Sequence, residues 1–283
     1  MARSLTMLSN QQFERLRQLA SRLAGIELVE RHRELLDRRR HRLKGLEREG
    51  IDSLLCAADA GDPNATRQVL SLVTTKFTGF FRHPRQFAAA AEHALRATRS
   101  RGQARMWSAG AATGEEPYSL AMALIEVFGR NEPPVTIVAT DIDEQALAFA
   151  ERAQFGKAAW AGLSGDRQNR FLLETGVPGH RVIAPNARRL VEFRALNLVK
   201  TTWPIEGPFD VILCRNVLMY LEAGCRGAVL ERMAGLLAPD GLLIQDPSEH
   251  LGVAAHRFTP KGDATYTARW SGEPANVAAP LCG

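Results

Sequence analysis

A glycine-containing turn between an apolar run and a helical pattern is the part of this sequence best suited to bind a small molecule. Residues 104–107 have the pattern of a β-strand, and residues 116–128 have that of a long helix. The turn between them holds Gly110 and Gly114 among other small residues. Because glycine lacks a Cβ atom, backbone N–H groups in such a turn can approach a ligand closely. The stretch 107–118 therefore predicts a cofactor cradle.

Two acidic residues near this cradle indicate which cofactor it takes. A dinucleotide site would have the spacing GxGxxG and an acidic residue about 20 positions later, whereas here the glycines are Gly110 and Gly114, and Asp141 lies further away. The turn offers no lysine of a phosphate-binding loop, and Glu115 would repel a phosphate but could hold a cation or an amino group. Asp141 ends the apolar run 135–140, where it could accept hydrogen bonds from two ribose hydroxyls. These features favour a cationic nucleoside without phosphates, S-adenosylmethionine, over NAD.

The elements that must position these residues alternate between strand and helix. Strand-like runs at 209–214 and 242–245 follow the run that ends at Asp141, and helical patterns at 144–153 and 224–237 separate them. Repeated βα units of this kind predict an α/β fold with a doubly wound, mostly parallel sheet.

One region interrupts this alternation. A helical pattern at 164–174 is followed by two strand-like runs, 181–184 and 188–196, which Pro185-Asn186 joins. We interpret residues 157–200 as a small antiparallel insert in the larger domain.

The chain before the cradle has helical patterns only. Ser9 and Gln12 have the spacing of a capping box that opens the first of four helices, and Gly50 ends the second. We therefore expect an all-helical N-terminal domain. The expected organisation is a helical domain at 1–75, a linker and connecting helix at 76–99, the sheet domain at 100–270 and a disordered tail at 271–283.

Charge is concentrated at the N-terminus. The net charge of the chain is +5, and residues 1–50 hold 12 lysines and arginines against 7 acids. Arg31, Arg38 and Arg42 fall on one flank of the predicted helix 30–49, so this domain is expected to meet an acidic partner. The cysteines form no CxxC pair, which argues against a metal site. No apolar run approaches the roughly 20 residues that span a bilayer, so we expect a cytoplasmic protein without membrane insertion.

Four sequence blocks in this order resemble the CheR-type chemotaxis receptor methyltransferases. They are Thr-x-Phe-Phe-Arg at 78–82, Trp-Ser-Ala-x-x-x-Thr-Gly-Glu-Glu-Pro-Tyr-Ser at 107–119, Thr-Asp-Ile-Asp at 140–143 and Phe-Asp-Val-Ile-Leu-Cys-Arg-Asn-Val-Leu-Met-Tyr at 209–220. The resemblance implies a Rossmann-like class I methyltransferase. Such an enzyme transfers a methyl group from S-adenosylmethionine to glutamate side chains on the cytoplasmic helices of chemoreceptors, leaving S-adenosylhomocysteine.

The resemblance also implies roles for individual residues. Tyr220 would lie near the transferred methyl group, and Arg82 would either pair with the carboxylate of the cofactor or orient the incoming glutamate. Arg31, Arg38 and Arg42 would steer the acidic receptor helices. The expected cofactor-binding residues are Lys76, Thr78, Arg82, Gly110, Glu115, Asp141, Asn197, Leu198, Arg215 and Asn216.

Two departures from the family pattern stand out. Lys76 occupies a position where relatives usually carry asparagine, and a cation there should weaken the binding of a sulfonium unless the ammonium pairs with a carboxylate. On this basis Lys76→Asn is expected to strengthen S-adenosylmethionine binding. The Gly-His-Ser-Glu that follows the last core strand in the family reads Asp246-Pro247-Ser248-Glu249 here, which allows altered substrate preference or reduced activity.

Other functions remain open at this point. The chain could be a catalytically weak or inactive cofactor-binding protein that acts as an interaction module in a chemosensory pathway. It could also methylate carboxylates of another protein. Nucleic-acid binding ranks last because no aromatic residues are interleaved with the basic ones. We expect a monomer.

Overall fold

The computed structural model describes residues 7–40, 46–76 and 78–269. Arg42 and the tail at 271–283 lie outside the described residues. The capping box at Ser9 and Gln12 is confirmed, since each side chain bonds the backbone N–H of the other residue. Gly50 breaks the helical backbone with φ of 75°. The N-terminal helices are α1 (Asn10–Ala24), a 3₁₀ turn η1 (Glu30–His32), α2 (Arg33–Arg40), α3 (Leu46–Asp59) and α4 (Pro63–Val73).

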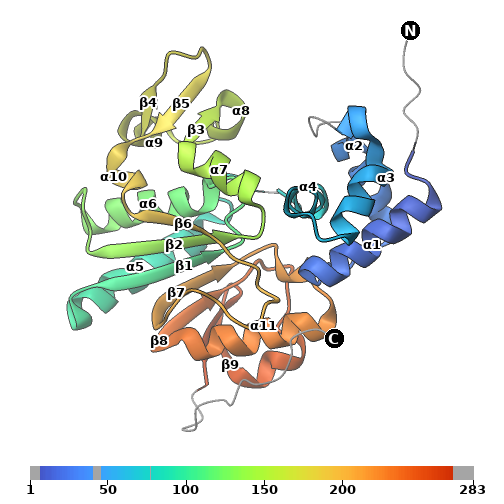
Figure 1. The fold of residues 1–283 in the computed structure, drawn as a ribbon. Helices are drawn as coiled ribbons and strands as arrows, with labels where there is room; N and C mark the ends of the chain where they lie inside the picture. The colour runs from blue at the N-terminus through green and yellow to red at the C-terminus, as the bar shows by residue number, and fades with distance from the viewer. Residues whose placement is uncertain (1–6, 41–45, 77, 270–283) are drawn as a thin grey trace.

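A seven-stranded sheet forms the larger part of the molecule (Figure 1). Its order is β6-β2-β1-β7-β8-β10-β9, and the first five strands run parallel. The chain moves outward from β1 to β2 and later returns to the other side of β1 with β7. The order therefore reverses between β1 and β7, which confirms the predicted doubly wound sheet. The strands are β1 (Ala104–Ala109), β2 (Val135–Asp141), β6 (Val191–Ala195), β7 (Phe209–Cys214), β8 (Leu237–Ile244), β9 (Phe258–Gly262) and β10 (Thr265–Ala268).

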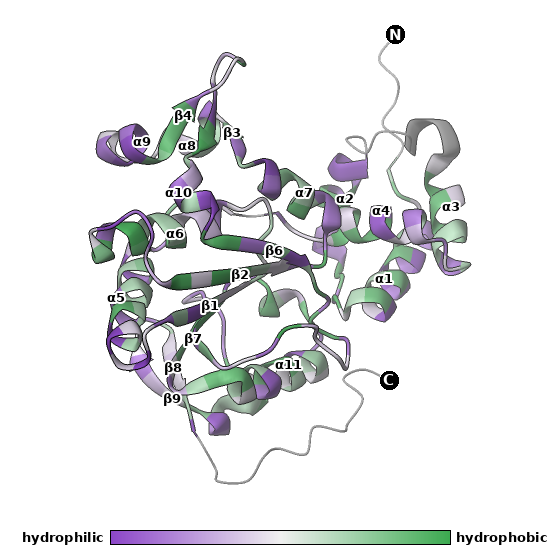
Figure 2. Ribbon diagram, turned by 60° about the vertical axis from the view of Figure 1, so that its left-hand side comes forward, coloured by the Kyte–Doolittle hydropathy of each residue, from purple (hydrophilic) through white to green (hydrophobic). Residues whose placement is uncertain are grey.

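Helices cover both faces of this sheet. Successive side chains of a strand point to opposite faces, and here the side chains on both faces are apolar. Met106 and Ile137 pack on the face covered by α5 and α6, whereas Trp107 and Val138 belong to the cluster on the α11 side. Figure 2 shows apolar residues along the central strands, and both apolar and polar residues on the covering helices α5 and α11. The covering helices are α5 (Pro84–Arg101), α6 (Glu115–Phe128), α7 (Glu144–Arg152) and α11 (Ala223–Leu236).

The insert differs from the predicted pairing. The run 188–196 is not its second strand, because β6 pairs in parallel with β2 and forms the edge of the main sheet. Instead, β5 is flanked by two short strands, one on each side, and pairs antiparallel with both. Three short helices accompany these strands. The elements are β3 (Gln154–Gly156), α8 (Lys157–Trp160), α9 (Gly165–Phe171), β4 (Leu172–Glu174), β5 (His180–Ile183) and α10 (Pro185–Arg188).

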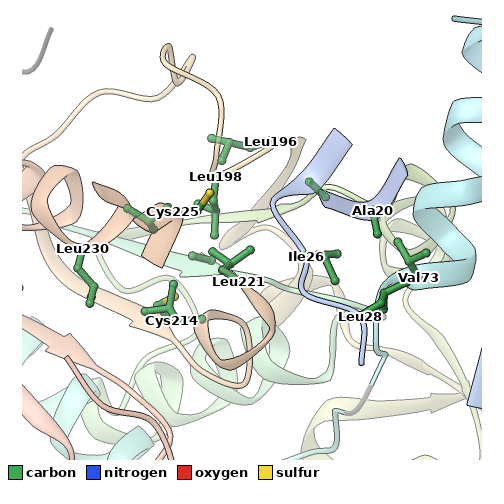
Figure 3. Packing of buried hydrophobic residues seen from close by; sticks show 14 of the residues in the cluster. Ala20, Ile26, Leu28, Val73, Leu196, Leu198, Cys214, Leu221, Cys225 and Leu230 are labelled. Atoms are coloured by element: carbon green, nitrogen blue, oxygen red, sulfur yellow. The ribbon is translucent and has the colours of Figure 1, made fainter. Parts of the chain in front are cut away.

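A continuous apolar core joins the N-terminal helices to the sheet domain. Ile26 forms a β-bridge with Leu221, and Figure 3 shows both beside Val73 and Leu198. These residues belong to one cluster that extends from α1 to α11. The helical region is therefore packed against the sheet domain rather than tethered to it. Among the described helices, none combines the length and apolarity needed to cross a membrane.

Candidate active site

A cleft opens where the strand order reverses, at the carboxyl ends of β1, β2 and β7. Ligands of doubly wound sheets bind at this position. The cleft encloses about 1050 Å³ when its open mouth is included. Its walls come from the sheet, from lining residues within 73–76 and 78–82 and from the end of α1, so the linker and the helical region complete it. The expected site residues that line it are Lys76, Thr78, Arg82, Gly110, Asp141, Asn197, Leu198, Arg215, Asn216 and Tyr220.

Asp141 ends β2 and faces the turn that follows β1. One carboxylate oxygen accepts the N–H of Ala112 at 2.8 Å, and the other accepts the N–H of Asp143 at 2.9 Å. Each oxygen has a further lone pair, so the carboxylate can accept two more hydrogen bonds from a ligand. Burial raises the pKa of Asp141 above its ordinary value, while the two backbone hydrogen bonds oppose that rise.

The two glycines of the turn are required for different reasons. Gly110 lines the cleft with φ of 85°, and a Cβ atom there would lie 2.2 Å from Val217 Cγ2. Gly114 has φ of 97° and does not line the cleft; a Cβ atom there would lie 2.8 Å from the Cβ of Ala150 on α7. Gly110 thus lets the turn approach both a ligand and the loop after β7, whereas Gly114 lets α6 pack against α7.

Glu116 lines the cleft, while Glu115 turns away from it. The Glu115 carboxylate accepts the hydroxyl of Thr113 at 2.6 Å, and burial raises its pKa. The Glu116 carboxylate accepts the hydroxyl of Ser108 at 2.8 Å and lies 3.3 Å from Nη1 of the buried Arg215. Burial also raises the pKa of Glu116, and Arg215 opposes that rise. Sequence reasoning singled out Glu115, but the acid available to a ligand is its neighbour.

Glu249, which sequence reasoning did not assign to the site, organises the loop after β7. This buried carboxylate accepts four backbone N–H groups at 2.8–3.3 Å, and Asn216 in that loop has φ of 57°, unfavourable for a residue other than glycine. Burial raises the pKa of Glu249 and the backbone hydrogen bonds oppose that rise. The loop delivers Arg215, Asn216 and Tyr220 to the cleft. The four donors are the N–H groups of Asn216, Val217, Met219 and Asp246.

Lys76 pairs with a carboxylate, which is the exception that the sequence argument allowed. Its ammonium lies 3.0 Å from Oδ2 of the buried Asp143 and donates to Ser71 Oγ at 3.0 Å. The other oxygen of Asp143 caps α7 by accepting the N–H groups of Gln145 and Ala146. The lysine therefore ties the linker to the start of α7, two residues beyond Asp141.

This pairing reverses the expectation for Lys76→Asn. We now expect the change to weaken S-adenosylmethionine binding about fivefold, because the linker loses its ionic tether and Asp143 loses its cation. The expected loss of affinity is small because Lys76 is partly exposed, and solvent screens an ion pair at such a position. Lys76→Arg keeps the charge and should bind like the wild type. Titration calorimetry measures both, and tighter binding by the asparagine variant would mean that repulsion of the sulfonium dominates.

Asn197 and Leu198 connect the cleft to the helical region. The amide of Asn197 donates to the carbonyl of Leu23 at 2.8 Å, and its oxygen accepts the N–H of Val199 at 3.1 Å. Leu198 is largely buried in the core cluster beneath the cleft. The end of α1 therefore holds this wall of the cleft in place.

The expected substrate-binding arginines lie away from the cleft. Arg31 and Arg38 are exposed on the helical region, and Arg38 pairs with Glu34 one turn earlier in α2. The adjacent Arg39 turns inward and donates to the carbonyls of Leu72 and Thr74. Arg39 thus anchors α2 to α4, next to the linker that lines the cleft.

The charged side chains that line the described part of the cleft form ion pairs, with the exception of the carboxylate of Asp141. No cation pairs with Asp141 among the ion pairs of the described residues. This distribution suits a ligand with positive charge and hydroxyl donors, and it offers no free basic clamp for a pyrophosphate. Each cationic side chain of the described lining is paired with an acid: Lys76 with Asp143, Arg82 with Asp246 and Arg215 with Glu116.

Known proteins are similar in sequence to this chain over nearly its full length. Residues 76–266 match the family model of the CheR methyltransferase, SAM binding domain. Chemotaxis protein methyltransferase 2 of Pseudomonas aeruginosa is 34% identical over 261 residues, which cover 92% of this chain and 93% of that protein. The chemotaxis protein methyltransferase of Salmonella typhimurium is 33% identical over 264 residues, which cover 92% of this chain and 90% of that protein. The chain therefore belongs to the CheR methyltransferase family.

Proposed function

We propose that the protein transfers methyl groups from S-adenosylmethionine to glutamate side chains on the cytoplasmic helices of chemoreceptors, and so tunes adaptation in chemotaxis-type signalling. The observation that carries the proposal is the cleft at the switch point, where, within the described part of the chain, no cation pairs with Asp141 and each lining cation is paired with an acid. The near full-length relatives, which are named chemotaxis protein methyltransferases, support the same reaction here.

The residues of the cleft fit this cofactor. Asp141 retains acceptor capacity for the two ribose hydroxyls, and the family resemblance implies that Asn197 and Leu198, which line the cleft, contact the adenine. Glu116, which lines the cleft, supplies a negative charge for the ammonium group of the cofactor. When bound, S-adenosylmethionine supplies an electrophilic methyl group on a sulfonium.

The acceptor explains why the site needs no general base. A glutamate side chain has a pKa of about 4.3, so it is already an ionised nucleophile at neutral pH. The protein then has to align this carboxylate and exclude water rather than move a proton. Tyr220, at the end of the loop that Glu249 holds, and Arg82, from the linker, line the cleft where they can do so.

The exposed arginines of the helical region provide a means of attracting the substrate. Arg31 and Arg38 lie on the region that Arg39 joins to the linker. Acidic receptor helices would be drawn to this face and hence toward the mouth of the cleft. We propose that the protein acts in this way as a monomer in the cytoplasm.

Methyl transfer to receptor fragments tests the function. Purified protein is incubated with tritiated S-adenosylmethionine and the cytoplasmic fragment of a chemoreceptor, with a fragment in which the acceptor glutamates are alanine as control. We expect labelling of the first fragment only, and release of the label as volatile methanol in alkali, as a carboxylate ester requires. A bound cofactor without any labelling would support the interaction-module alternative, and alkali-stable label would exclude a glutamate ester.

A further inference from the structure

We propose that Asp246 is a positioning residue that holds the Arg82 guanidinium in the orientation that receives the acceptor carboxylate. The inference rests on the proposed function, because it assigns Arg82 to the methyl acceptor rather than to the cofactor. Asp246 is one of the two departures from the family pattern described above.

The geometry of Asp246 suits a fixed counterion. Its side chain is almost wholly buried behind the cleft, and Oδ1 accepts the hydroxyl and the N–H of Ser248 at 2.6 and 3.0 Å. Its Oδ2 lies 3.5 Å from Arg82 Nη2 and 3.3 Å from His83 Nε2. Burial by itself would raise the pKa of Asp246, but the hydrogen bonds from Ser248 and Asn216, together with the charge of Arg82, outweigh it and lower the pKa to about 2.

The backbone of Arg82 also has a partner in the site. The carbonyl of Arg82 accepts a hydrogen bond from Arg215, the cation that pairs with Glu116. Arg82 lines the cleft, and its Nη2 lies near Asp246, whereas its Nη1 is buried; the side chain as a whole is about one-third exposed. Asp246 therefore contacts Nη2, and the part of the Arg82 side chain that lines the cleft can meet a carboxylate that enters it.

Asp246 also limits where Arg82 can turn. The cleft contains the carboxylates of Glu116 and Asp141, both of which attract a guanidinium. Burial raises the pKa of Glu116, and the charge of Arg82 is among the influences that oppose that rise. Without Asp246, Arg82 would move toward these acids and pair with one of them on the cofactor side of the cleft. It would then no longer be available to bind the acceptor carboxylate.

A double-mutant cycle tests the inference. Asp246→Asn is expected to raise KM for the receptor fragment about tenfold, with the Kd for S-adenosylmethionine changed by less than about twofold. Arg82→Gln should raise KM for the fragment at least as much. In the Arg82→Gln background, Asp246→Asn should have no further effect, because Asp246 acts through the arginine. Ser248→Ala, which removes a bond to the same carboxylate without touching Arg82, is the matched control and should shift KM by less than about threefold.

Additive effects in the cycle would overturn the inference, as would a lower KM in Asp246→Asn, which would mean that Asp246 competes with the acceptor. A readout that needs no receptor separates this inference from the proposed function. The order parameter of the Arg82 Nε–Hε group, measured by ¹⁵N relaxation with S-adenosylhomocysteine bound, should fall in Asp246→Asn and stay unchanged in Ser248→Ala. An unchanged order parameter in Asp246→Asn would refute positioning even if no receptor fragment were methylated.

Discussion

Asp141→Ala is expected to lower the affinity for S-adenosylmethionine at least about a hundredfold and to abolish methyl transfer at cofactor concentrations that saturate the wild type. The reason is the loss of a charged acceptor for two hydroxyls, since hydrogen bonds to charged groups contribute roughly 1.5–3 kcal/mol each. The side chain also bonds the N–H groups of Ala112 and Asp143, so the turn after β1 loosens as well. Calorimetry and transfer of tritiated methyl measure the two effects.

Two comparisons separate recognition of the ribose from loss of the turn. Asp141→Asn keeps one oxygen and should lose about tenfold, whereas Asp166→Ala, at an exposed acid in the first turn of α9, should bind normally. Because burial raises the pKa of Asp141, lowering the pH should protonate it earlier than an ordinary aspartate. Wild-type affinity should therefore fall on acidification, and that of Asp141→Asn should change less. Full activity in Asp141→Ala would overturn the assignment of the cofactor site.

The residues at strand ends could be predicted because the topology places them. In a doubly wound sheet the carboxyl ends of neighbouring parallel strands meet, so Gly110, Asp141 and Arg215 had to converge once the strands were recognised. Glu115 and Glu116 could not be separated in this way. Successive helical residues point about 100° apart, and the sequence does not show which of the two faces the cleft.

The predictions that failed concern residues that are distant in the sequence but paired in the fold. This holds both for the strand pairing and for the site residues that were not predicted. The run that contains β6 has a strand pattern, but its alternation does not reveal whether it pairs within the insert or with β2. The hairpin of β9 and β10 forms against β8 and gave no clear local signal, since Pro260 and several charged or small residues interrupt it. Likewise, the carboxylate that pairs with Lys76 lies on another element, Asp143 at the start of α7.

Glu249→Gln is expected to lower kcat at least tenfold while the Kd for S-adenosylmethionine rises less, because the loop that carries Tyr220 loses its anchor. Each carboxylate oxygen accepts two backbone N–H groups. A glutamine of either orientation therefore turns its amide N–H₂ toward two donors, and each buried unsatisfied donor costs about 1–3 kcal/mol. Asn216, with φ of 57°, would then relax and carry the rest of the loop with it.

A control and two measurements distinguish a local effect from general destabilisation. Glu231→Gln, on α11, removes ion pairs to His256 and Arg257 near the surface and should leave kcat unchanged. Thermal unfolding should show Glu249→Gln folded but with Tm lower by several degrees, as an unsatisfied buried group implies. Hydrogen exchange should then locate the loss of protection at the amides of Asn216, Val217 and Met219, which donate to the carboxylate. If those amides kept their protection and kcat were unchanged, Glu249 would be a structural acid without a role in presenting Tyr220.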